Sequence, residues 1–174
     1  LWIMLMIGGM ATPHADVSLI VSAAEPQANQ WFYVGVKFDM DPDWHIYWKN
    51  PGESGFPPRF KWSVPMTQPF EWPVPKTYEM GRILNFVYDG APIIVFRQKW
   101  AHNALPESLT VDVSWLECAD ICVPQDMTLS LTFPLDAEDA RIQPAQFNQP
   151  DRMVSRFQIL PAVVTDHDEG SKWV

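Results

Sequence analysis

Hydrophobic and polar residues alternate along several short segments of the chain, and this pattern predicts β-strands. The segments are residues 16–22, 31–40, 44–48, 91–100, 109–116 and 127–133. Alternation with a period of two is typical of antiparallel strands that bury one face. It predicts two buried sets of four side chains: Phe32, Val34, Val36 and Phe38, and Leu109, Val111, Val113 and Trp115.

The segments between these strands have the composition of turns. "DPDW", "NPGESG" and "YDGAP" combine proline, which fixes φ, with glycine, which accepts positive φ. Seventeen prolines in 174 residues also interrupt the chain too often for long helices. The predicted fold class is therefore all-β, an immunoglobulin-like antiparallel β-sandwich. A small β-barrel is the alternative.

The two ends of the chain differ in character from the middle. Residues 1–11, "LWIMLMIGGMA", form an apolar run too short to span a membrane, with Gly9 and Ala11 at the −3 and −1 positions of a signal-peptidase site. We interpret them as the remnant of a signal peptide; a buried N-terminal strand is the alternative. We expect the sandwich domain to occupy residues 12–134. Residues 135–174 are expected to be a linker, with 157–164 starting a following domain or returning to the sandwich.

The net charge limits the classes of partner, and the expected export of the chain sets its compartment. A net charge of −9 and a pI near 4.7 exclude nucleic acid as a partner and disfavour anionic membrane surfaces. Membrane association is expected only through a transmembrane segment that follows the domain. An exported chain lies where disulfides are chemically permitted, which gives the two cysteines a redox context.

The only two cysteines, Cys118 and Cys122, lie in "WLECADICVP". Four residues of extended strand span about 13 Å, too far for a disulfide, whereas four residues of helix rise about 6 Å. The spacing therefore predicts an inserted helical turn, or a tight loop, between a strand that ends at Leu116 and one that begins near Met127. Val123 and Pro124 would close this turn.

A disulfide over so few residues removes little entropy from the unfolded chain, so its value as a structural staple is small. The spacing thus favours thiol–disulfide exchange, with a structural disulfide and a metal site as alternatives. Zinc would need two further ligands, and the four histidines show no paired spacing. Copper suits the eight methionines better, but no M-x-x-M array occurs after the leader. We expect neither a metal nor a cofactor.

Three residues near the cysteines or the aromatic segments are candidates for supporting roles. Glu117 and Asp120 flank the pair, and carboxylates that face the sulfurs raise the pKa of a thiol. The alternative is that both carboxylates point to solvent. His45 lies between aromatic residues and is expected to be a satisfied polar group rather than a catalyst.

Two blocks of sequence resemble a known family. "WHIYWKNPGESG" (44–55), followed by "WLECADICVP" (115–124), is similar to the N-terminal periplasmic domain of DsbD- and ScsB-type thiol:disulfide interchange proteins, the disulfide bond corrector family. The resemblance runs from about Asp16 to Pro134. Cysteines of the DsbD branch are spaced further apart, so the three-residue gap is closer to the ScsB branch.

The resemblance implies a periplasmic redox domain, part of a protein-disulfide reductase tethered to the inner membrane. Its electrons would come from a thioredoxin-like domain of the same or a partner transmembrane reductase. They would pass to periplasmic thioredoxin-fold proteins, including those of cytochrome c maturation and, in the ScsB branch, of copper tolerance. Cys118 and Cys122 would be the exchanging pair, with Cys122 forming the mixed disulfide.

The DsbD branch also shields its sulfurs with an aromatic cap. The candidates in this chain are Phe86 and Tyr88 within "NFVYDG" (85–90), with ordinary core packing as the alternative. Two other classes of function stay open from the residues: an exported binding module with a structural disulfide, and a copper-handling domain.

Overall fold

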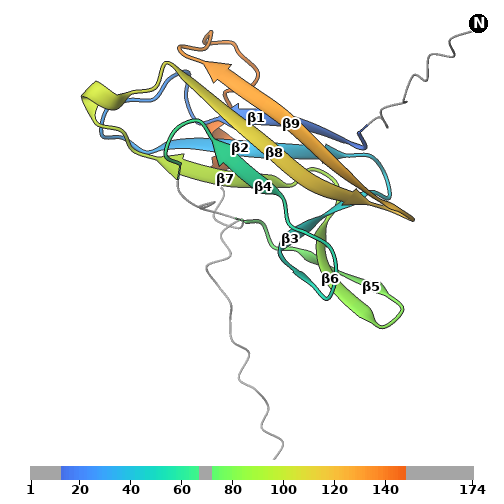
Figure 1. Cartoon of the computed structure of the whole chain (residues 1–174). Coiled ribbons are helices and arrows are strands. Elements are labelled where there is room, and N and C mark those ends of the chain that lie inside the picture. The colour runs from blue at the N-terminus through green and yellow to red at the C-terminus, as the bar shows by residue number, and fades with distance from the viewer. Residues whose placement is uncertain (1–12, 67–71, 148–174) are drawn as a thin grey trace, which may run out of the picture.

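The computed structural model describes residues 13–66 and 72–147, and in this part the chain forms two antiparallel sheets (Figure 1). The first sheet has the order β1 (Ala15–Val21), β2 (Phe32–Met40) and β7 (Ile93–Gln98). The second has the order β4 (Arg59–Trp62), β8 (Ser108–Cys118), β3 (His45–Gly52), β6 (Ile83–Tyr88) and β5 (Lys76–Met80), with β9 (Cys122–Thr132) also paired to β8. Two short 3₁₀ turns are η1 (His102–Ala104) and η2 (Pro144–Phe147). The predicted sandwich is confirmed, and the barrel alternative is wrong because the two sheets are separate.

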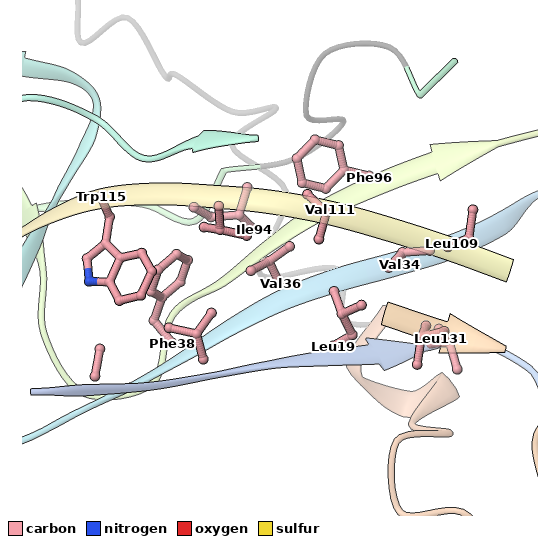
Figure 2. Packing of buried hydrophobic residues seen from close by; sticks show 14 of the residues in the cluster. Leu19, Val34, Val36, Phe38, Ile94, Phe96, Leu109, Val111, Trp115 and Leu131 are labelled. Atoms are coloured by element: carbon pink, nitrogen blue, oxygen red, sulfur yellow. The ribbon is translucent and has the colours of Figure 1, made fainter. Parts of the chain in front are cut away.

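The main core lies between the sheets and contains both predicted sets of alternating residues. All eight side chains predicted to face inward on β2 and β8 are buried. The rings of Phe38 and Trp115 meet edge to face with centroids 5.7 Å apart, and Figure 2 shows Val36 and Ile94 on the side of this pair that faces Val111. Period-two alternation thus identified the core face of both strands correctly.

Three strands of the second sheet, β4, β5 and β6, were not predicted from the sequence. All residues of β5 are exposed, and β4 has only four residues, so neither carries a long alternating signal. The β5–β6 hairpin turns at Gly81, where φ is +66°. Figure 1 shows this hairpin projecting at the end of the sandwich where β8 and β9 join.

The two cysteines lie on a β-hairpin, so the predicted helical turn is wrong. β8 and β9 pair without a register shift from Ser108 and Thr132 to Cys118 and Cys122. β8 therefore runs past Leu116, β9 begins before Met127, and Val123 and Pro124 are strand residues. Directly opposed residues of neighbouring antiparallel strands lie about 4.5–5.5 Å apart, within disulfide range. The tight-loop alternative is the one that fits, because the chain folds back within the three residues between the cysteines.

Residues that follow β9 stay in contact with the sandwich. Leu135 is buried in the main core, and Ile142 forms a parallel bridge with Val21 of β1. The predicted domain limits remain predictions. Residues 1–11 and 157–164 lie outside the described residues. No helix among the described ranges is long and apolar enough to cross a membrane.

Candidate functional site at the Cys118–Cys122 disulfide

The two faces of β8 separate the cysteines from the main core. Val113, Trp115 and Glu117 point toward the three-stranded sheet and are buried. Leu116 and Cys118 point to the opposite, outer face of the six-stranded sheet, where Cys118 joins a second small cluster with Tyr47 and Val87. Because successive strand residues alternate between faces, the disulfide is packed apart from the main core.

The two sulfur-bearing residues differ strongly in exposure. Cys118 and Cys122 are disulfide-bonded, with Cα atoms 4.1 Å apart. Cys118 is 1% exposed, whereas Cys122 is exposed at the start of β9. Ile121, at the tip of the hairpin, is 66% exposed. A thiol or disulfide of another protein can therefore reach the sulfur of Cys122 but not that of Cys118.

Tyr47 of β3 is the side chain that contacts both sulfurs. Its hydroxyl lies 3.5 Å from Cys118 Sγ and 4.0 Å from Cys122 Sγ, and because a disulfide has no S–H, the hydroxyl is the donor. Burial raises the pKa of Tyr47, with a smaller opposing effect of the Ser54 hydroxyl. Tyr47 therefore keeps its proton at neutral pH and remains a donor toward sulfur.

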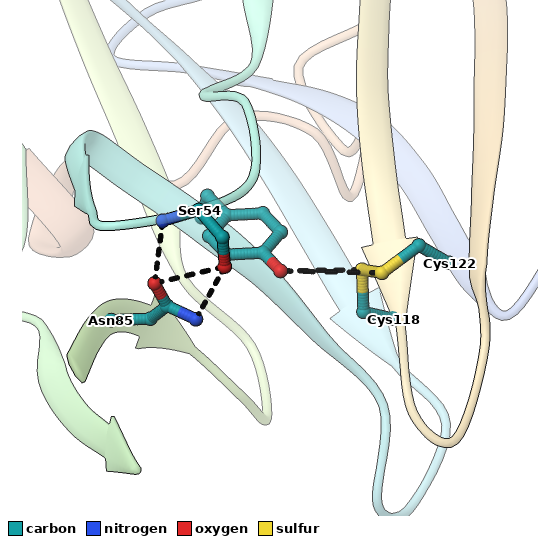
Figure 3. The surroundings of a disulfide bond; sticks show 5 residues. Ser54, Asn85, Cys118 and Cys122 are labelled. Atoms are coloured by element: carbon teal, nitrogen blue, oxygen red, sulfur yellow. Dashed lines mark hydrogen bonds between the residues drawn. A yellow bond between two sulfur atoms is a disulfide. The ribbon is translucent and has the colours of Figure 1, made fainter. Parts of the chain in front are cut away.

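The loop after β3 folds over the ring of Tyr47. Gly55 has a φ of +84°, and a Cβ atom at this position would lie 2.2 Å from the Tyr47 ring. Next to it, the Ser54 backbone N–H donates to Asn85 Oδ1 at 3.0 Å, and Asn85 Nδ2 donates to Ser54 Oγ at 2.9 Å. Figure 3 shows this network beside the disulfide. The loop, anchored to β6 by Asn85, holds Tyr47 against the sulfurs.

His45 lies directly opposite Cys118 in the β3–β8 pairing. It is 5% exposed, and its Nε2 atom has no hydrogen-bond partner among the described residues. The ring lies between Tyr47 and Tyr78, with centroid distances of 5.6 Å and 4.6 Å. Burial lowers the pKa of His45, and the charge of Asp89 opposes part of this effect. The expectation of a fully satisfied polar group is therefore wrong for Nε2.

Glu117 does not share a face with the sulfurs. Its carboxylate is fully buried and accepts hydrogen bonds from Trp115 Nε1 at 3.1 Å, Gln125 Nε2 at 2.8 Å and the His14 backbone N–H at 2.9 Å. Neither alternative from the sequence fits this position, because Glu117 faces neither the sulfurs nor solvent. It ties the start of β1 to the hairpin. Asp120 is exposed in the turn between the cysteines, and its effect on the thiol pKa stays a prediction.

The structure does not support the cap predicted at Phe86 and Tyr88. Tyr88 belongs to the main core and donates a hydrogen bond to the Pro73 carbonyl, while Phe86 meets Trp48 edge to face. On β6 it is Val87 that lies on the sulfur face. Tyr47 takes the predicted position against the sulfurs. His45 and Tyr47 are two residues apart in "WHIYW" and so share a strand face, but nothing in the sequence shows that this face carries the cysteines.

No cluster of three or more His, Cys, Asp or Glu side chains suited to a metal occurs within residues 13–66 and 72–147. The Tyr47 phenol contacts both sulfurs, and the His45 imidazole lies opposite Cys118 in the strand pairing. These groups donate or accept protons, so the site as described is equipped for sulfur and proton chemistry.

Comparison with known proteins identifies a family and two similar structures for this chain. The family model "Thiol:disulfide interchange protein DsbD, N-terminal" matches residues 15–134. The N-terminal periplasmic domain of ScsB from Proteus mirabilis has a similar structure, with a TM-score of 0.63 and 21% sequence identity over 78% of this chain and 53% of that one. The chain thus spans about half of that solved structure.

A second solved structure is more distant. The Neisseria meningitidis DsbD N-terminal domain in the reduced form matches with a TM-score of 0.48 and 15% identity, over 71% of this chain and 91% of that one. No curated protein sequence matches the chain significantly. The family match and the bonded cysteine pair together support thiol–disulfide interchange.

Replacing Gly55 with alanine tests the loop over Tyr47. We expect Gly55→Ala to lower the free energy of unfolding by about 2–4 kcal/mol, from positive-φ strain and the clash with the ring. Gly81→Ala is the matched control, because Gly81 also has positive φ but nothing within 4 Å of its Cβ position, and we expect it to cost about 1 kcal/mol. Urea denaturation of the oxidised domain measures both values. Equal losses would show that the loop does not press on Tyr47.

The buried imidazole of His45 predicts a pH dependence of stability. Its pKa is lower in the folded state than the ordinary value of 6.5, so the unfolded chain binds more protons below that pH and stability falls as the pH is lowered. We expect the melting temperature of the oxidised domain to fall more between pH 7 and pH 5 than that of His45→Gln. Parallel curves for the two proteins would contradict a neutral, buried His45.

Proposed function

Since the chain belongs to the family of DsbD N-terminal domains, we propose that it relays electrons between proteins through the Cys118–Cys122 disulfide and dithiol. The difference in exposure between the two sulfurs carries the proposal. Exchange needs one sulfur that a partner can reach and a second that resolves the intermediate, and Cys122 and Cys118 fit these two roles.

Reduction of the domain proceeds through a mixed disulfide. A partner thiolate attacks Cys122 Sγ in line with the S–S bond, and Cys118 leaves with the bonding electron pair as a thiolate. The Tyr47 hydroxyl, 3.5 Å from that sulfur in the oxidised state, donates a hydrogen bond that stabilises the charge. The second thiolate of the same partner then attacks the partner sulfur of the mixed disulfide, and Cys122 leaves as a thiolate. The partner is now a disulfide, and Cys118 and Cys122 are a dithiol. Reduction of the next partner follows the same steps in reverse.

The proposed partners are thioredoxin-fold proteins. The electrons enter from a thioredoxin-like domain of the same or a partner transmembrane reductase and leave to periplasmic thioredoxin-fold proteins, including those of cytochrome c maturation and copper tolerance. The ScsB relative is described as periplasmic, which supports the same compartment here. The proposed division of the chain is a leader remnant in residues 1–11, the redox domain in 12–134 and a linker in 135–174.

The surface beside the sulfurs suits contact with another protein. A groove of about 490 Å³ runs along the outer face of β8 and β9, where Leu116 lies opposite Pro124, one same-face position from the cysteine pair. Phe56, which is 64% exposed, lines this groove. Ile121, exposed at the hairpin tip next to Cys122, adds a second exposed apolar side chain of the kind found at protein interfaces.

Single cysteine variants test the assignment of the two sulfurs. Reduced Cys118→Ser keeps the exposed Cys122, and reduced Cys122→Ser keeps the buried Cys118. We expect Cys118→Ser to react with glutathione disulfide at least about tenfold faster and to accumulate the mixed disulfide, because thiol reactivity depends on access. Both variants unfolded in urea are the control and should react at similar rates. Equal rates in the folded proteins, or a faster Cys122→Ser, would contradict the proposal.

A further inference from the structure

His45 has a position next to the reacting sulfurs that the exchange steps above do not use. The β3–β8 pairing places it directly opposite Cys118, and directly opposed residues on one sheet face have Cβ atoms about 4.5–5.5 Å apart. Both side chains lie on the outer face with Tyr47. Among the described histidines, His45 is the one that this pairing brings to the resolving sulfur.

The residues packed around the His45 imidazole keep it able to accept a proton. It is packed by Tyr47 on its own strand, Cys118 on β8 and Tyr78 on β5, and Nε2 lacks a partner among the described residues. The charged group that acts on it is Asp89, after β6, whose carboxylate pairs with Lys76 at 2.6 Å. Glu117 is on the other face of β8. Burial lowers the pKa of His45, so the imidazole is neutral at pH 7 and has one unprotonated nitrogen.

Tyr47 cannot perform the same task. Its hydroxyl already carries a proton at neutral pH, since burial raises its pKa. It donates a hydrogen bond to a sulfur but does not take a proton from a thiol. A thiol buried as deeply as Cys118 holds its proton more firmly than a free one, so a second group is needed to remove it.

We propose that His45 accepts the proton of the Cys118 thiol when Cys118 resolves the mixed disulfide, and returns it in the reverse step. This inference rests on the proposed exchange function. Cys118 Sγ attacks Cys122 Sγ, the bond between Cys122 and the partner breaks, and the partner sulfur leaves as a thiolate with the electron pair. Over the whole exchange the Cys118–Cys122 dithiol is oxidised by two electrons to the disulfide, and the partner disulfide is reduced by two electrons to thiols. The proton moves from Cys118 to the imidazole and then to solvent or the departing thiolate.

A two-phase reaction isolates the resolving step. The reduced domain is mixed with 5,5′-dithiobis(2-nitrobenzoate), which first forms a mixed disulfide at Cys122 and releases one equivalent of coloured thiolate. Attack by Cys118 then releases the second equivalent. We expect His45→Gln and His45→Phe to slow the second phase about tenfold or more near pH 7, as removal of a general base does, without changing the first phase.

The dependence on pH distinguishes proton transfer from packing. At high pH hydroxide deprotonates Cys118, so the difference between the native protein and His45→Gln should close. A second phase unchanged by the substitutions, or slowed by one factor at every pH, would overturn the inference. His102→Gln is the matched control, because His102 is exposed in η1, which precedes the far end of β8; both of its phases should match the native protein.

A measurement on the native protein covers the case in which the variants do not fold. The imidazole proton shifts of His45, followed by NMR across pH, should titrate differently in the disulfide and dithiol forms, because a thiol replaces a bonded sulfur opposite the ring. Identical titrations would overturn the role of His45. Release of only one coloured equivalent by the native domain would instead contradict the exchange function itself, so the two failures are distinguishable.

Discussion

The pairing of β8 with β9 is the constraint on which the site depends. All eleven residues of β8 are paired in one register, from Ser108 to Cys118. A slip of one residue along β8 would move its whole apolar set, from Leu109 to Trp115, out of the core. The burial of these residues therefore fixes the register, and the register places Cys118 opposite Cys122. The same strand that completes the core thus presents the redox pair on its other face.

This division separates the chemistry from the stability of the fold. The sulfurs belong to a small outer cluster with Tyr47 and Val87, whereas the main core lies between the two sheets. The S–S bond is therefore made and broken in the outer cluster, apart from the main core. The bond closes a short hairpin turn whose strands are already paired along their length, so it adds little constraint to the unfolded chain. Both features fit a disulfide that is opened and closed during function.

The sequence predicted the core better than the site. Alternation identified the buried faces of β2 and β8, because each has a long run of apolar residues with a period of two. It missed the exposed β5, which has only five residues and only two apolar positions, Tyr78 and Met80, that alternate. The helical turn at Cys118 was wrong because the spacing of two residues along the chain does not show whether the chain folds back. The roles of His45 and Tyr47 depend on which strand lies beside β8, and this long-range pairing is absent from local sequence.

The family resemblance identified two separate sequence blocks that local hydrophobic patterns could not connect. The two blocks at residues 44–55 and 115–124 belong to β3 and to the β8–β9 hairpin, which are neighbours in the sheet. They are therefore two parts of one site rather than independent motifs. The cap assigned to Phe86 and Tyr88 shows the limit of the transfer, since both rings lie on the core side of β6 while Tyr47 contacts the sulfurs.

The most direct test of a working dithiol is a redox titration combined with thermal unfolding. The domain is equilibrated in glutathione and dithiothreitol buffers of graded potential, its oxidised fraction is measured by thiol alkylation and mass, and its melting temperature is recorded at both extremes. We predict a reversible midpoint between about −120 and −270 mV, the range of known exchange proteins, with little difference between the two melting temperatures. A midpoint below about −300 mV, with reduction only when the fold melts, would show a structural disulfide and contradict the relay.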